Sequence, residues 1–316
     1  MTSDAYTEAW LAGPQKTQFY TRTYLAPPAS SKAVLVFIHG FAEHIGRYTE
    51  AHPQLAAAGV NVFTFDERGF GKTALDEEHK SKSSAYGKTS GEDQMDDICW
   101  AIEHARSTFP ELPVFLCGHS MGGGEVLNFP IRRADAAKVL AGVIACSPIV
   151  RQTKPSSKVQ RWLGGKVAMV TPYMTIPAPL DFGHLTHDAA YNKMCETDPL
   201  AQLKGSLRGI SDMLNWGDEL LLKTHKNWPK ALPVLFLHGT GDQITCHAAA
   251  TEFYDKIVSD DKNMIYYEDG FHELLHEPAH REKMLADMVA FVEAHLPKSA
   301  APASVAPESK IVEAKL

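Results

Sequence analysis

The chain has 316 residues, of which 44% are hydrophobic and 22% are charged. These proportions are typical of globular proteins and exclude a fibrous or a mainly disordered chain. The formal net charge of −7 argues against a nucleic-acid-binding protein, because such a protein needs a basic excess to pair with phosphates.

Strands and helices are predicted to alternate along most of the chain. Helix-length stretches such as Glu92–Ser107 and Arg281–His295 lie between or after apolar runs that are bounded by turn residues. The runs that we interpret as buried strands are Ala33–His39, Val60–Asp66, Val114–Gly118, Val139–Cys146, Val234–His238 and Met264–Tyr267. The alternation predicts an α/β fold with a mostly parallel central sheet and helices on both of its faces.

The alternation stops between Arg151 and Lys230, where no clear strand pattern is found and prolines are frequent. We therefore expect residues 151–230 to form a cap or lid insertion, and residues 1–150 and 231–297 to form the core. Residues 298–316 are rich in Ala, Ser, Pro, Lys and Glu and poor in large apolar groups, so they are predicted to form a disordered tail.

A nucleophile is predicted at Ser120. The sequence Gly118-His119-Ser120-Met121-Gly122 is a G-x-S-x-G pattern, and it directly follows the apolar run that ends at Gly118. A serine hydroxyl presented on a tight turn between a strand and a helix needs small neighbours, because larger side chains would collide with the backbone. Ser120 therefore has the sequence context of a catalytic serine.

A general base and a carboxylate follow later strands of the same predicted sheet. His272 lies just after the run Met264–Tyr267, and a histidine can accept and return a proton near neutral pH. Asp242 follows the run Val234–His238 through a glycine-rich turn and is suited to orient the imidazole. The order Ser120, Asp242, His272, each after its own strand, is the order of a hydrolase triad.

Two backbone N–H groups are predicted to bind the oxyanion of an acyl-transfer reaction. One is that of Met121, directly after the nucleophile, and the other is that of Phe41, in the turn after the strand Ala33–His39.

A metal-dependent alternative rests on His272-Glu273-Leu274-Leu275-His276, which matches H-E-x-x-H. In that motif two histidines one helical turn apart bind zinc and the glutamate activates water. Gly270 directly upstream argues against the helix that the motif needs, and the longer pattern would require glycine and histidine at Ala279 and Glu282, although His280 or His295 could serve as a third ligand. A zinc-dependent hydrolase therefore remains an alternative to the serine hydrolase.

With these residues identified, the chain resembles fungal-type monoacylglycerol lipases within the α/β-hydrolase superfamily, which are grouped with serine aminopeptidase S33-like hydrolases. The resemblance runs from about Tyr20 to Leu296. It rests on His39-Gly40-Phe41-Ala42-Glu43-His44, Gly46-Arg47-Tyr48, Asp66-Glu67-Arg68-Gly69-Phe70-Gly71, Gly118-His119-Ser120-Met121-Gly122-Gly123, Gly241-Asp242 and His272.

The resemblance implies hydrolysis of monoacylglycerol to glycerol and a free fatty acid through an acyl-enzyme on Ser120, with no metal or organic cofactor. It also implies that Phe41 and Met121 form the oxyanion hole. Phe41-Ala42 stands where animal members have a small Ala-Gly pair, so the nearby acyl pocket is expected to differ in shape. A lysophospholipase or another carboxylesterase remains the alternative within this class.

The predicted cap supports a lipid ester as the substrate. An apolar stretch from Trp162 to Ile176 follows Arg151, Lys154, Lys158 and Arg161, and basic flanks with apolar side chains suit peripheral contact with a membrane or a lipid droplet. Packing of these apolar groups over the active site explains the same pattern equally well. Five cysteines without a CxxC pair, and the absence of an early apolar run, lead us to expect a cytoplasmic protein. No pattern predicts the oligomeric state.

Overall fold

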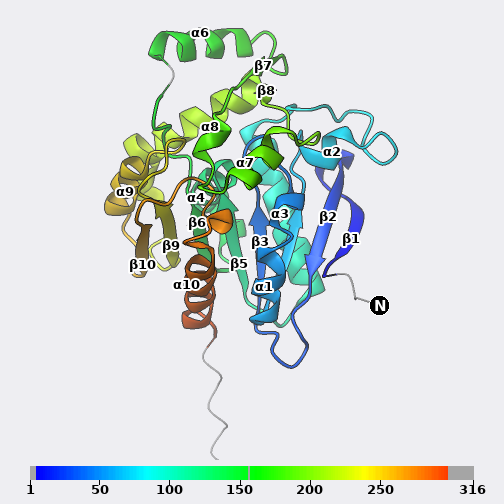
Figure 1. Ribbon diagram of the computed structural model, residues 1–316, viewed down its shortest axis with the longest axis vertical. Coiled ribbons are helices and arrows are strands. Elements are labelled where there is room, and N and C mark those ends of the chain that lie inside the picture. The colour runs from blue at the N-terminus through cyan, green and yellow to red at the C-terminus, as the bar shows by residue number, and fades with distance from the viewer. Residues whose placement is uncertain (1–4, 156, 298–316) are drawn as a thin grey trace, which may run out of the picture.

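An eight-stranded sheet runs through the molecule in the order β1-β2-β4-β3-β5-β6-β9-β10 (Figure 1). The structure is a computed structural model that describes residues 5–155 and 157–297, so the tail predicted at 298–316 lies outside the described residues. Strand β1 pairs with β2 and β2 pairs with β4 in antiparallel fashion, and the other neighbours are parallel. The strands are β1 (Thr7–Ala12), β2 (Gln18–Tyr24), β3 (Ala33–Ile38), β4 (Val60–Phe65), β5 (Val114–His119), β6 (Leu140–Cys146), β9 (Val234–Gly239) and β10 (Lys262–Tyr267).

The mostly parallel sheet predicted from the sequence is confirmed. The six predicted strands are β3, β4, β5, β6, β9 and β10, and every end lies within two residues of its predicted position. No strand was predicted before Ala33, although β1 and β2 form the antiparallel edge of the sheet. Strand β1 is largely exposed, so it lacks the continuous apolar run that identifies a buried strand.

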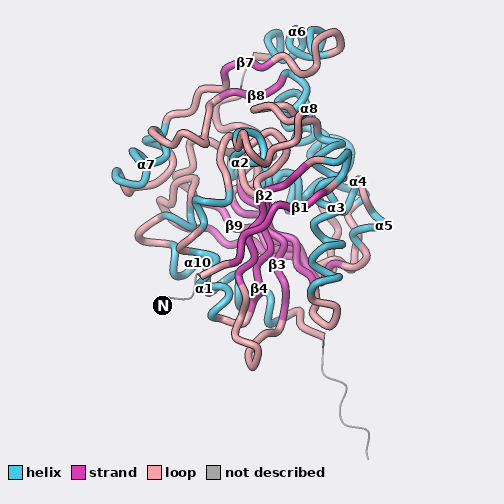
Figure 2. The backbone as a smooth tube through the Cα atoms, turned by 90° about the vertical axis from the view of Figure 1, so that its right-hand side faces the viewer, coloured by secondary structure: helices cyan, strands magenta, loops and turns pink. Residues whose placement is uncertain are grey.

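Helices cover both faces of the sheet, and Figure 2 shows the strands between them. Along β3, Val34, Val36 and Ile38 pack with α3, α4 and α9, whereas the alternate residues pack with α1 and α10 on the opposite face. The helices are α1 (Ala51–Ala57), α2 (Gly71–Leu75), α3 (Gly91–Thr108), α4 (Met121–Arg132), α5 (Ala134–Ala137), α6 (Lys158–Ala168), α7 (Ala189–Glu196), α8 (Leu207–Glu219), α9 (His247–Lys256) and α10 (Arg281–Ala294). The predicted helices Glu92–Ser107 and Arg281–His295 correspond to α3 and α10.

The region between β6 and β9 lies over the carboxyl ends of the parallel strands and contains α6, α7 and α8 (Figure 1). It also contains a short antiparallel pair, β7 (Thr175–Pro177) with β8 (Lys204–Ser206), where no strand was predicted. Three residues are too few to produce a periodic pattern. None of the helices in the described ranges is both long and apolar enough to span a bilayer.

Helix α4 follows the nucleophile and contains Pro130, which has no backbone N–H to donate within the helix. The helix extends only two residues beyond Pro130, to Arg132, and a new short helix, α5, starts at Ala134. The first residue of α4, Met121, directly follows Ser120, so the positive end of the dipole of α4 lies beside the nucleophile.

Candidate active site

Ser120 occupies a sharp turn between β5 and α4. Its φ of 55° and ψ of −111° lie in a region that residues with side chains rarely adopt. The turn is packed so closely that a Cβ on Gly122 would lie 2.4 Å from the carbonyl oxygen of Ile38, and one on Gly118 would lie 2.2 Å from that of Gly122. The backbone N–H of Ser120 donates to the carbonyl of Cys146 at 2.9 Å. These contacts hold the serine in its strained conformation.

Ser120, His272 and Asp242 are brought together from three separate loops. The Nε2 atom of His272 lies 2.9 Å from Ser120 Oγ, and its Nδ1 atom lies 2.8 Å from Asp242 Oδ2. His272 and Asp242 are both buried. Burial alone would raise the pKa of Asp242, but the neighbouring imidazoles of His272 and His238 hold it well below its usual range. The carboxylate therefore stays ionised and can stabilise a positively charged His272.

Asp242 is fixed by donors that the sequence analysis did not identify. Its Oδ1 accepts the backbone N–H groups of Ile244 at 2.7 Å and Thr245 at 2.9 Å, and its Oδ2 accepts the Thr245 hydroxyl at 2.7 Å. The Nε2 atom of His238 lies 3.3 Å from the same Oδ2. A polar residue three positions after the carboxylate is a weak signal, so Thr245 could not be recognised from the sequence.

The two predicted oxyanion donors, Phe41 and Met121, flank the nucleophile. Among the described residues, no partner accepts a hydrogen bond from either of these backbone N–H groups. The Phe41 loop is close to Ser120, because a Cβ on Gly40 would lie 3.0 Å from the Cβ of Ser120. The Phe41 loop is joined to the turn that carries Ser120 by the N–H of Gly122, which donates to the carbonyl of His39 at 3.2 Å.

The side chain of His39 braces the same loop. Burial lowers the pKa of His39 to about 4, so the imidazole is neutral. Its Nδ1 lies 2.7 Å from the carbonyl of Gly40, and its Nε2 accepts the N–H of Glu67 at 2.9 Å. These partners require the proton on Nδ1. His39 therefore joins the oxyanion loop to the loop after β4.

A cavity of about 390 Å³ opens in front of Ser120 and His272. Its volume is within the range of small-molecule sites. The walls are mainly apolar. Ile244 follows β9, and most of the other apolar residues come from the region between β6 and β9: Ile149, Ile176, Pro177, Ala178, Pro179, Leu180, Phe182, Leu185, Leu203, Ile210, Met213 and Leu214. The charged residues Glu43, Arg47, His119, Lys154 and Glu273 also line it.

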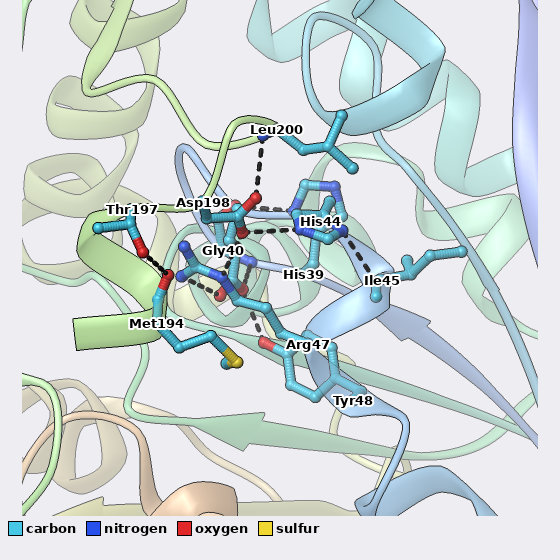
Figure 3. A network of polar contacts seen from close by, with 12 residues as sticks. His39, Gly40, His44, Ile45, Arg47, Tyr48, Met194, Thr197, Asp198 and Leu200 are labelled. Atoms are coloured by element: carbon cyan, nitrogen blue, oxygen red, sulfur yellow. Dashed lines mark hydrogen bonds and ion pairs between the residues drawn. The ribbon is translucent and has the colours of Figure 1, made fainter. Parts of the chain in front are cut away.

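One of these charged groups, Arg47, belongs to a network of polar contacts that joins the region between β6 and β9 to the core (Figure 3). Asp198 lies 2.8 Å from the Nε2 atom of His44 and 3.5 Å from the Nε atom of Arg47. The guanidinium of Arg47 also lies 3.5 Å from Glu43. Asp198 thereby anchors the segment after α7 to the loop after β3.

A second charged pair lies beside the catalytic histidine. The Nε2 atom of His119 is 3.5 Å from Glu273 Oε1, and the rings of His119 and His272 are 4.8 Å apart. Burial lowers the pKa of His119, but the charge and hydrogen bonding of Glu273 outweigh this effect and raise the pKa to about 9. Glu273 and His119 therefore carry opposite charges at neutral pH.

The structure contradicts the zinc interpretation of His272-Glu273-Leu274-Leu275-His276. Residues Leu274–His276 form one 3₁₀ turn rather than an α-helix. Both ring nitrogens of His272 are used by Asp242 and Ser120, whereas His276 contacts the carbonyl of Arg47 at 2.8 Å and Glu273 at 3.3 Å. Without the helix, the two histidines are not held on one face as a pair of metal ligands.

The chain is similar to known proteins over most of its length. Residues 29–279 match the model of the family described as serine aminopeptidase, S33. A putative monoglyceride lipase of Schizosaccharomyces pombe is 37% identical over 262 residues, which are 81% of this chain; the chain spans 66% of that relative's length.

Two solved structures are also similar. A soluble variant of Saccharomyces cerevisiae monoglyceride lipase, in complex with a substrate analog, superposes with a TM-score of 0.81 at 24% identity, covering 95% of this chain and 97% of that one. Paleococcus ferrophilus monoacylglycerol lipase superposes with a TM-score of 0.76 at 26% identity, covering 88% and 99%. These matches confirm the α/β-hydrolase fold and the resemblance inferred from the motifs.

Proposed function

The chain belongs to the serine aminopeptidase S33 family, and on this premise we propose that it is a serine hydrolase that cleaves monoacylglycerol to glycerol and a free fatty acid. The observation that carries the proposal is the hydrogen-bonded series Ser120, His272 and Asp242 at a mainly apolar cavity. The relatives that are named monoglyceride lipase or monoacylglycerol lipase support the choice of substrate.

The reaction proceeds in two acyl-transfer steps. Ser120 Oγ attacks the ester carbonyl carbon while His272 Nε2 takes the hydroxyl proton, and ionised Asp242 stabilises the imidazolium. The N–H groups of Phe41 and Met121 donate to the carbonyl oxygen as it becomes an anion. The ester C–O bond then breaks, and the glycerol oxygen leaves with the proton from His272. Water, deprotonated by His272, attacks the acyl-enzyme and releases the fatty acid and Ser120.

The cavity lining favours a neutral alcohol over a phosphate-containing head group. Arg47 is paired with Glu43 and Asp198, and His119 is paired with Glu273, so these cations are already neutralised by carboxylates. Glycerol hydroxyls can donate to the carboxylates without breaking these pairs, whereas a phosphodiester would have to compete with the carboxylates for the cations. Lys154 also lines the cavity, and its positive charge favours the phosphate of a lysophospholipid. Lysophosphatidylcholine is therefore included in the fatty-acid release assay described below.

We also propose that the protein works as a cytoplasmic enzyme at the surface of membranes or lipid droplets. Met169 and Val170, directly after α6, are 70% and 82% exposed, and Tyr173 and Met174 nearby are exposed as well. Apolar side chains in this position suit insertion into a lipid surface. Replacing Val170 with Asp is expected to weaken sedimentation with neutral lipid vesicles, and unchanged sedimentation would contradict the proposal.

Release of fatty acid from oleoylglycerol tests the proposed reaction. Wild type is expected to be active with and without a zinc chelator, Ser120→Ala inactive, and Ser107→Ala, an exposed serine at the end of α3, unchanged. Activity in Ser120→Ala would contradict the mechanism. Faster release from lysophosphatidylcholine than from oleoylglycerol would contradict the substrate.

A further inference from the structure

A second cavity adjoins the one in front of Ser120 and shares four lining residues with it. It measures about 290 Å³ and lies between α6 and α8. Ile176, Pro177, Ile210 and Leu214 line both cavities, whereas Glu43, Arg47, His119 and Glu273 line only the first. The second cavity, which we call the α6–α8 slot, therefore extends the apolar part of the active site and not its charged part.

The wall of the slot on the α6 side is formed by the backbone of Gly164 and Gly165. Glycine is unfavourable within a helix, so two in succession need a structural reason. Close packing is not that reason, because a Cβ on Gly164 would meet no described atom within 4 Å. A Cβ on Gly165 would meet only Ser211 Oγ, at 4.0 Å. The glycines leave space between the two helices that the described side chains do not fill.

The opposite wall is apolar, with Leu207, Ile210 and Leu214 of α8 facing the slot. The polar residues at the slot, Arg161, Ser211 and Asn215, are hydrogen-bonded among themselves. Arg161 donates to Asn215 Oδ1 at 3.0 Å and Asn215 donates to Ser211 Oγ at 3.1 Å. Arg161 is in addition paired with Asp218 at 2.7 Å. These groups have polar partners of their own, so an uncharged apolar ligand leaves their bonds intact.

We propose that the α6–α8 slot receives the distal methylenes of a long acyl chain whose ester lies at Ser120, and that Gly164 and Gly165 determine the longest chain accepted. The inference rests on the proposed esterase function, and it deepens that function by naming residues that select the substrate. A flexible hydrocarbon chain fits a narrow space with apolar walls, because each buried methylene gains free energy by leaving water.

The test measures kcat/KM for p-nitrophenyl octanoate and p-nitrophenyl palmitate in wild type and in Gly165→Leu. The leucine side chain starts from a Cβ that points towards Ser211 across the slot. We expect kcat/KM for the palmitate ester to fall at least about 15-fold, since each excluded methylene costs roughly fourfold and at least two are excluded. The octanoate ester should react within about twofold of wild type, because only the distal methylenes of a long chain are proposed to enter the slot.

Two variants separate loss of space from other effects. Gly165→Ala makes the same change from glycine but fills little of the slot, and Val167→Leu adds bulk to α6 at an exposed residue outside the slot. Both should keep the wild-type ratio of palmitate to octanoate activity. Circular dichroism at rising temperature checks that Gly165→Leu folds.

Equal loss of both activities in Gly165→Leu, or no loss of either, overturns the inference. The esters contain no glycerol, so the result does not depend on the alcohol that the enzyme prefers. If wild type cleaves the p-nitrophenyl esters but not oleoylglycerol, the proposed monoacylglycerol substrate fails while the chain-length test still stands. If wild type cleaves none of them, the proposed function and the inference fail together.

Discussion

Replacing Thr245 with valine removes a hydroxyl that lies 2.7 Å from Oδ2 of the catalytic carboxylate and 3.0 Å from the carbonyl of Ser147. Valine has nearly the same shape, and the backbone N–H groups of Ile244 and Thr245 still bind Asp242 Oδ1. The shorter of these two contacts is the 2.7 Å hydrogen bond to Oδ2, the same oxygen that His272 contacts, and its loss weakens the support of the triad. A hydrogen bond to a charged group contributes about 1.5–3 kcal/mol. At 1.4 kcal/mol per factor of ten, kcat should fall between about tenfold and a hundredfold.

Steady-state hydrolysis of oleoylglycerol measures this effect. KM should change little, because Thr245 holds the carboxylate rather than the acyl chain or the alcohol. Thr245→Ser keeps the hydroxyl and should retain most of kcat. Thermal unfolding of both variants shows whether a fall in kcat reflects a loss of folded protein. The reasoning is refuted if Thr245→Val retains kcat within about twofold, or if Thr245→Ser loses as much as Thr245→Val.

Three further predictions concern packing and ionisation. Gly122→Ala should lower both the melting temperature and the esterase activity, because the added Cβ would lie 2.4 Å from the Ile38 carbonyl oxygen. An unchanged melting temperature would contradict the close packing of the turn that carries Ser120. Burial raises the pKa of Glu125 to about 8, above the ordinary value of about 4.3. Between about pH 4.3 and pH 8 the native state therefore binds more protons than the unfolded state, and the free energy of unfolding declines as pH rises. Glu125→Gln should therefore reduce the decline in unfolding free energy between these pH values, as measured by urea denaturation, and a decline equal to that of wild type would argue against it. Glu273→Gln removes the charge that raises the pKa of His119 to about 9, so the titration of this imidazole, followed by NMR, should move to lower pH and not stay in place.

The central part of the fold could be predicted because buried parallel strands are continuous apolar runs. Each run ends at the same edge of the sheet, so a functional residue just after a run falls near the others. This reasoning found Ser120 after β5, Asp242 after β9 and His272 after β10. The structure brings these three side chains into hydrogen-bonding contact.

The supporting residues could not be predicted because their partners are distant in the sequence. The Ser147 hydroxyl donates to the carbonyl of His272 at 2.8 Å, and Asp198 is bonded to His44, 154 positions away. Neither contact leaves a periodic pattern or a motif. The same holds for β7 and β8, whose pairing depends on how the chain folds back over the core.

The segment from His272 to His276 fits both a zinc-dependent hydrolase and a serine hydrolase as long as only its sequence is known, and the backbone conformation decides between the two. On an α-helix, residues four apart lie on one face, and the two histidines would converge on one metal ion. Here the segment follows the last strand, and Asp269 has a φ of 56° that turns the chain before His272. His272 points to Ser120, Glu273 to His119, and His276 to the carbonyl of Arg47. The turn after β10 therefore distributes the three side chains among separate partners, and this leaves His272 free to exchange a proton with the serine.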